Sequence, residues 1–203
     1  MALFSCGTMD EVIGDGLNLY QLNMDIIPVL AMRTLNLSNV QISPAGLLHL
    51  AALRESPDLT TLVLRMPTVT YPHQTAVLGE LFQAVAHSNV RVLNVSGCSM
   101  DELAWDAVGL CLQASKLESL TLKNNGIADN GAVCLAKAIQ SNSTLTNIEL
   151  ELVGNCITPP GARVLVQRRQ PPLTLNLELK CECMDDRTEL LALAAESGLR
   201  LTI

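Results

Sequence analysis

Aromatic side chains are almost missing from this chain, at 2% of 203 residues, although 49% of the residues are hydrophobic. A core without large rings has to be filled by Leu, Ile, Val and Ala side chains. The length suits one large domain or an elongated array of repeats. The composition therefore favours thin, regular aliphatic layers over a globule centred on aromatic residues.

Positive charge is also scarce, because 13 Lys and Arg residues face 20 Asp and Glu residues, which gives a net charge of −7. A surface of this sign repels phosphate backbones, so we expect no nucleic-acid partner. No apolar run is long enough to cross a bilayer, and the first residues, MALFSCGTMDEVIGDG, contain no basic side chain. The sequence therefore predicts neither a membrane partner nor a secretory signal.

Paired cysteine spacing is absent as well, since the seven cysteines are an odd number scattered along the chain. This usage is typical of free thiols in a reducing compartment, and it predicts a cytoplasmic protein. Cys181 and Cys183 form one local pair, but no third and fourth ligand stands at zinc spacing. We therefore expect structural thiols and no metal.

The motifs of common enzyme and cofactor sites are missing too. The chain contains no GxGxxG, GxxxxGK[ST], HExxH or GxSxG pattern. His49, His73 and His87 do not stand near a cysteine or serine in a way that pairs a base with a nucleophile. The sequence predicts a protein that is not an enzyme and binds no cofactor.

What the chain does contain is a repeat. Residues 117–127, LESLTLKNNGI, alternate for only three residues around Leu120 and Leu122 before two asparagines and a glycine end the pattern. Similar stretches begin at 32, 59, 90 and 145, so the copies are 27, 31, 27 and 28 residues apart. In the last copy, with Ile148 and Leu150 as the central pair, Asn155 arrives two residues late. Five copies at a near-constant period predict a stacked array.

Weaker copies flank these five. Residues 173–184, LTLNLELKCECM, offer either Leu175 with Leu177 or Leu177 with Leu179 as the central pair. GLRLTI at residues 198–203 resembles a final strand, and LNLYQLNM at residues 17–24 is interpreted as a degenerate first one.

The second half of each unit has helical spacing. Leu78, Leu81, Phe82 and Val85 fall on one helical face, and the segments after 101 and 129 show the same pattern. Start signals precede these helices. They are Ser43-Pro44, Asp101, Asp129 and Thr158-Pro159. Each unit is therefore predicted to be a short strand, a turn, a helix and a return loop.

This combination resembles the leucine-rich repeat, and the unit length is similar to that of the ribonuclease-inhibitor-like subclass. The resemblance implies an α/β solenoid, curved, with a parallel sheet on its concave face and helices on its convex face. Residues 31–203 are predicted to form the repeats, with a capping helix and strand at the C-terminal end. Residues 1–30 are expected to be an N-terminal cap or a degenerate first repeat.

A buried Asn is expected where each strand turns inward. Backbone groups there lose their ladder partners, and an Asn side chain can satisfy both N–H and C=O groups. Asn125 and Asn155 occupy that place, and Cys98 is the alternative that the family uses. Val40 and Pro67 depart from the pattern, so their turns must be satisfied in another way.

Strand side chains that do not enter the core are expected to project from the concave sheet. The predicted rows across the sheet are Ser38, Arg65, Ser96, Lys123 and Glu151, and Asn36, Val63, Asn94, Thr121 and Glu149. The residues predicted to bind a partner are Asn36, Ser38, Arg65, Asn94, Ser96, Thr121, Lys123, Glu149 and Glu151. For any single residue of these rows, the favoured interpretation is a solvent-exposed side chain without a binding role, with Lys123 paired to Glu151. For the face as a whole, the favoured interpretation is a surface that binds a partner.

The sequence thus predicts a non-catalytic module, a scaffold, inhibitor or sensor, that binds a protein partner. The resemblance leaves two alternatives. One is a GTPase-activating or other regulator acting in trans, although the loops SNVQIS, GCSMDE and NNGIAD lack the arginine that such activity needs and Arg65 lies on a strand. The other is a structural subunit of an assembly or the C-terminal sensor part of a receptor.

Overall fold

The computed structural model describes the greater part of the repeat array. The described residues are 11–13, 32–36, 38, 54–65, 74–98, 100–142, 148–167, 173–178, 184–196 and 200–203. The statements below concern these residues. The predicted copy at residues 17–24, the turn residues Val40 and Pro67, the start signal at Ser43-Pro44, and His49, His73, Cys181 and Cys183 lie outside them.

One sheet of eight parallel strands runs the length of the molecule, and its strands follow each other in chain order. The strands are β1 (Glu11–Ile13), β2 (Thr34–Asn36), β3 (Thr61–Arg65), β4 (Val92–Ser96), β5 (Ser119–Thr121), β6 (Ile148–Glu151), β7 (Leu173–Asn176) and β8 (Arg200–Thr202). Because each strand pairs only with its neighbours in sequence, the sheet grows by one strand per unit.

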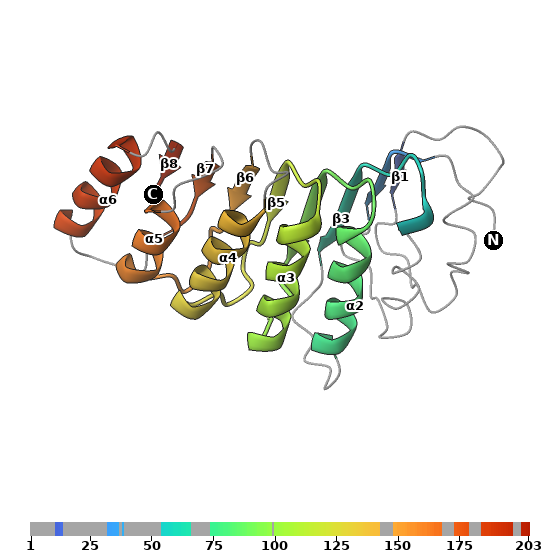
Figure 1. The fold of residues 1–203 in the computed structure, drawn as a ribbon, viewed down its shortest axis with the longest axis horizontal. Coiled ribbons are helices and arrows are strands. Elements are labelled where there is room, and N and C mark those ends of the chain that lie inside the picture. The colour runs from blue at the N-terminus through green and yellow to red at the C-terminus, as the bar shows by residue number, and fades with distance from the viewer. Residues whose placement is uncertain are drawn as a thin grey trace.

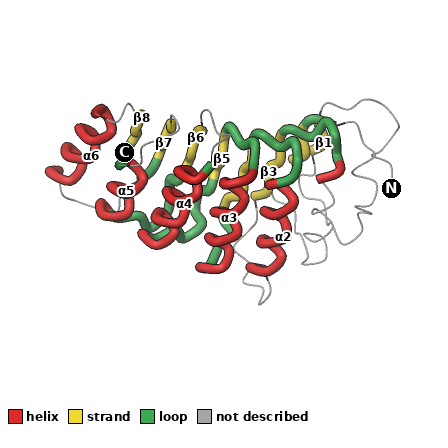
Figure 2. The backbone as a smooth tube through the Cα atoms, viewed as in Figure 1, coloured by secondary structure: helices red, strands yellow, loops and turns green. Residues whose placement is uncertain are grey.

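The described helices lie along one side of this sheet, parallel to each other (Figure 1). They are α2 (Gln74–Ala86), α3 (Glu102–Ala114), α4 (Asp129–Ser141), α5 (Pro159–Val166) and α6 (Met184–Glu196). The tube in Figure 2 shows the same order of strand, loop and helix in the units from β4 to α5. The predicted α/β solenoid, with strands on the concave wall and helices on the convex wall, is confirmed.

The core is a continuous aliphatic layer between sheet and helices. Leu120 and Leu122 of one unit are buried against the same layer as Leu93 and Val95 of the unit before. From the helix side, the small residues of α4 let the helix lie close to the sheet. The buried residues of α4 are Gly131, Ala132, Leu135, Ala136, Ala138 and Ile139. The layer holds Phe82 and Trp105 among its few aromatic side chains, as the composition requires.

The helix starts are partly as predicted. Asp101 is the N-cap of α3, and its carboxylate accepts a hydrogen bond from the Ala104 backbone N–H at 3.1 Å. The prediction for Asp129 is wrong, because the N-cap of α4 is Ala128. Asp129 instead accepts hydrogen bonds from the backbone N–H and hydroxyl of Thr158 at 2.8 and 2.6 Å. This carboxylate therefore links α4 to the start of α5.

The register of β6 differs from the prediction by two residues. Leu150 pairs with Leu120, and Glu151 lies opposite Thr121. The central buried pair of this unit is therefore Leu150 and Leu152, and not Ile148 and Leu150. With that pair, Asn155 stands at the same place as Asn125 and is not late.

Two further expectations concern the terminal units. Leu175 pairs with Leu150, and the buried pair of that unit is Leu175 and Leu177; Leu179 lies outside the described residues. The last described helix and strand are α6 and β8. At the other end, the strand next to β2 is β1, which lies before the segment at residues 17–24.

Candidate functional site

The face of the sheet opposite the helices carries three rows of side chains, and no described helix covers them (Figure 1). The alternation within each strand decides which residues these are, since Leu62 and Leu64 of β3 are buried while Arg65 is exposed. The first row contains Thr34, Thr61, Val92, Ser119, Glu149, Thr174 and Arg200. The second contains Asn36, Val63, Asn94, Thr121, Glu151, Asn176 and Thr202. The third contains Arg65 and Ser96, and Lys123 follows β5 on the same side.

All nine residues predicted to bind a partner lie on or directly after these strands, and seven of them keep their predicted rows. The exceptions are Glu149 and Glu151. The sequence places Glu151 in the row of Ser96 and Lys123, but the register puts it opposite Thr121. Glu149 correspondingly lies opposite Ser119, and not in the row of Thr121. The predicted rows are therefore wrong at β6, because the repeat pattern in the sequence was placed two residues away from the register that the structure shows.

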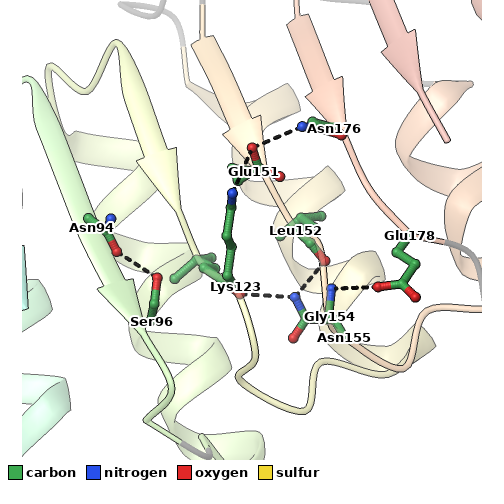
Figure 3. A network of polar contacts seen from close by, with 10 residues as sticks. Asn94, Ser96, Lys123, Glu151, Leu152, Gly154, Asn155, Asn176 and Glu178 are labelled. Atoms are coloured by element: carbon green, nitrogen blue, oxygen red, sulfur yellow. Dashed lines mark hydrogen bonds and ion pairs between the residues drawn. The ribbon is translucent and has the colours of Figure 1, made fainter. Parts of the chain in front are cut away.

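Two Asn-x-Ser pairs on this face are held by bonds within their own strands. Asn94 accepts a hydrogen bond from the Ser96 hydroxyl at 2.6 Å (Figure 3). Asn36 accepts from the backbone N–H and the hydroxyl of Ser38 at 3.1 and 2.7 Å. The hydroxyl proton is engaged in each pair, so the free groups offered to a partner are the amide N–H groups of the two asparagines.

Lys123 is engaged within the molecule. Its ammonium lies 3.4 Å from Glu151 Oε2, and that oxygen also accepts a hydrogen bond from Asn176 Nδ2 at 2.9 Å. Figure 3 shows this chain of contacts spanning three adjacent strands. The expected pairing of Lys123 with Glu151 is thus confirmed, and the carboxylate is only 19% exposed. A partial burial of this kind makes the pair stronger than a fully solvated one.

Residues that the sequence reasoning missed complete the face. Thr174, Asn176 and Arg200 come from β7 and β8. Glu178 follows β7 and accepts a hydrogen bond from the Gly154 N–H at 3.2 Å (Figure 3). The sequence signal that could have identified Thr174 and Asn176 is the alternation around Leu175 and Leu177. The sequence analysis left this pair and the pair Leu177 and Leu179 as two alternatives. Val92, 36% exposed, also lies on this face, although it is not among the residues predicted to bind a partner.

Below the strands, two buried asparagines join consecutive units. Asn155 Oδ1 accepts from the backbone N–H groups of Asn125 and Ile127, both at 3.0 Å. Its Nδ2 donates to the carbonyls of Leu122 and Leu152 at 2.9 and 2.7 Å. Asn155 is fully buried.

Asn125 repeats this arrangement one unit earlier. Its Nδ2 donates to the Val95 carbonyl and its Oδ1 accepts from the Cys98 N–H, both at 2.7 Å. Cys98 itself is buried. The predicted role of Asn125 and Asn155 in satisfying the turn backbone is confirmed. Cys98 Sγ lies 3.7 Å from the Ser96 carbonyl oxygen.

Cys111, Cys134 and Cys156 are free thiols. Burial raises the pKa of the Cys111 thiol to about 12, against a smaller opposing effect of its hydrogen bond with Ser115. Such a thiol stays protonated at neutral pH and is a poor nucleophile. Within the described part of the chain, no group of three His, Cys, Asp or Glu side chains is placed to hold a metal ion.

The family model described as Leucine Rich repeat matches residues 113–136 and 141–166. These two segments are similar to leucine-rich repeats. They run from β5 to α5, apart from residues 137–140 of α4, and contain Asn125 and Asn155. No match was found among curated proteins. Among the described helices of this repeat array, none combines the length and the apolar character that crossing a bilayer requires.

Proposed function

We propose that this repeat array is a non-catalytic module that binds a protein partner through its concave sheet. The residues proposed to contact the partner are Asn36, Ser38, Arg65, Asn94, Ser96, Thr121, Lys123, Glu149 and Glu151. Thr174, Asn176 and Arg200 extend the same face. Leucine-rich repeats generally mediate contacts between proteins, which supports the class of function.

One observation carries the proposal, namely the open face of the parallel sheet. Parallel sheets are ordinarily covered on both sides, and their strands are then apolar on both faces. Here the described helices cover one side, while the other bears Thr, Ser and Asn side chains of intermediate exposure. A broad surface of short polar side chains on a rigid frame can contact a partner closely at a small cost in side-chain entropy.

We assign the units to the ribonuclease-inhibitor-like subclass. The distances between equivalent core leucines support this, since Leu62, Leu93, Leu120 and Leu150 are separated by 31, 27 and 30 residues. A full α-helix of 13 residues in α2, α3 and α4 supports it as well. A cytoplasmic location belongs to the same proposal, supported by the free thiols among the described residues.

The two alternatives from the sequence gain no support from the described residues. A regulator acting in trans through Arg65 would lose rate and keep its binding in an Arg65→Gln variant, whereas a binding module would show a modest loss of affinity and no change in any rate. This comparison separates the two classes in one substitution.

The proposed function is tested by blocking the concave face with a bulky side chain. Thr121→Trp places an indole in the middle row of the sheet, and Gln113→Trp places one on the exposed surface of α3 as a matched control. Both proteins are used to capture partners from a lysate of the source cells, and both are checked by circular dichroism and thermal melting. We expect partners that are lost with Thr121→Trp and kept with Gln113→Trp. Identical partner sets for the two folded variants would overturn the concave site.

A further inference from the structure

The charged side chains of the concave face fall into two groups. Lys123 and Glu151 neutralise each other, and Glu178 is bonded to Gly154. Arg65 and Glu149, in contrast, are exposed and have no ion pair or hydrogen bond among the described residues. A partner could satisfy these two opposite charges without first breaking an internal contact, and the same holds for Arg200 in the terminal strand β8.

Arg65 and Glu149 stand at opposite corners of the central sheet. The order of strands places Glu149 three strands beyond Arg65. Arg65 pairs with Ser96, whereas Glu149 lies in the row of Val92, four residues earlier along the strand. Strand spacings of about 4.8 Å and residue steps of about 3.3 Å combine to a diagonal of about 20 Å between the two Cα positions.

The surface along this diagonal carries no net charge. Its side chains are Val92, Asn94, Ser96, Ser119 and Thr121, all hydroxyl, amide or aliphatic. Desolvating such groups costs little in comparison with desolvating a charge. The protein has a net charge of −7, but this part of its surface is uncharged and lies between one cation, Arg65, and one anion, Glu149.

We propose that the concave sheet binds an extended segment of a partner protein that carries one acidic and one basic side chain about six residues apart. This inference rests on the proposed function and adds the chemistry of the partner. The acidic side chain meets Arg65 and the basic one meets Glu149. An extended chain covers the diagonal in about six residues, and an even spacing places both side chains on the same side of the segment.

Arg200 is the third charge on this face that has no partner among the described residues. It lies in the row of Glu149 but two strands further on, in the terminal strand β8. A segment that spans the diagonal ends before reaching it, so Arg200 is not part of the proposed contact.

The test uses synthetic peptides as probes. Fluorescein-labelled twelve-residue peptides of Ser, Thr, Asn and Val carry one Glu and one Arg separated by two, four, six or eight residues. Their affinity for the full chain is measured by fluorescence anisotropy at low and high salt. We expect the six-residue spacing to bind most tightly, with about two- to fivefold contributed by each charge contact and lost in high salt.

Charge reversals on the protein provide the decisive comparison. Arg65→Glu and Glu149→Lys should each weaken binding of the six-residue peptide. The double variant Arg65→Glu/Glu149→Lys restores one charge of each sign with the ends exchanged, so the same peptide should bind again in the opposite direction. Lys137→Glu and Glu80→Lys, on exposed positions of α4 and α2, are the matched controls of equal charge change.

The proposal is overturned by a lack of spacing preference, by equal losses in the two control variants, or by a folded double variant that does not recover. Absence of binding by every peptide of the panel also counts against it. If partners depend on the Thr121→Trp block while the peptides show no charge dependence, this inference fails and the proposed function stands. If the block has no effect on captured partners, the proposed function itself fails.

Discussion

The Asn155 side chain makes four hydrogen bonds to backbone groups of the described residues. Its one amide satisfies two N–H groups and two carbonyls in a place that water does not reach. Removing it leaves all four unsatisfied, and each buried group costs about 1–3 kcal/mol when it has no partner. We therefore expect Asn155→Ala to lower the free energy of unfolding by about 3–5 kcal/mol, measured by urea denaturation.

The matched control for this prediction is Asn130→Ala, which removes the same amide from an exposed position in α4. It should change the free energy of unfolding by less than about 0.5 kcal/mol. Equal losses in the two variants would mean that water or neighbouring groups replace the Asn155 bonds without cost.

The Cys111 thiol makes stability depend on alkaline pH. Its folded pKa of about 12 lies above its ordinary value of 9.0, so the folded state holds the proton more tightly than the unfolded state. The stability that comes from keeping this thiol protonated is fully present below pH 9 and is lost as the pH rises toward 12. Between pH 8 and 10.5 we expect the wild type to lose about 2 kcal/mol more than Cys111→Ala does.

The measurement is a pair of urea titrations at each pH, for the wild type and for Cys111→Ala. Other groups that titrate in this range are present in both proteins, so the comparison isolates the thiol. Parallel pH profiles of the two proteins would show that the thiolate is accommodated in the folded state.

At the scale of the helix, two glycines that look alike in the sequence have opposite surroundings. A Cβ on Gly109 of α3 would lie 3.8 Å from Ala138 Cβ, an ordinary contact. A Cβ on Gly161 of α5 would lie 2.3 Å from Asp129 Oδ1 and 3.0 Å from Asp129 Cα. That oxygen is the one that accepts the Thr158 N–H, so moving it breaks the link between α4 and α5.

Alanine favours a helix over glycine by up to about 1 kcal/mol, which predicts stabilisation by Gly109→Ala. At Gly161 the clash outweighs that gain, and Gly161→Ala should lower the free energy of unfolding by roughly 1–2 kcal/mol. Thermal melting of the two variants, followed by circular dichroism, checks the opposite signs. A stabilised Gly161→Ala protein would show that the Asp129 link is dispensable.

The elements also show why sequence reasoning succeeded at some places and failed at others. Strand positions such as Leu120 and Leu122 were predictable, because one buried face leaves a period of two. The register of β6 was not, because Ile148, Leu150 and Leu152 offer two overlapping alternations. Only the partner strand decides between them, and a two-residue slip preserves which side chains face outward. The exposed residues were therefore correct while their rows were wrong.

At the scale of the whole molecule, the α/β solenoid could be predicted from the repeat alone, whereas the charge state of its face could not. The free charges on the diagonal, Arg65 and Glu149, emerge only after Glu151 is seen to neutralise Lys123. Such pairings join residues about 25–30 positions apart, and the sequence does not indicate which of several neighbours is chosen.

Stability should be uneven along the array. β8 has one neighbouring strand, and α6 buries only Leu190 and Ala194, whereas α4 buries six residues. Amides of β8 and α6 are therefore expected to exchange with deuterium by local opening, at least tenfold faster than those of β5 and α4. Hydrogen exchange followed by mass spectrometry measures this difference. Uniform protection along the chain would indicate that the array unfolds as one cooperative unit.

The Asp129–Thr158 link and the asparagine bonds share one property, which is that each of them joins a unit to the unit beside it. Under mechanical tension applied at the two ends of the chain, such an array is a series of elastic elements. The units would yield one after another, starting from the weakest junction. Each step would release a contour length of about 100 Å, the extended length of one unit, so the protein could lengthen under load while most of its sheet stayed intact.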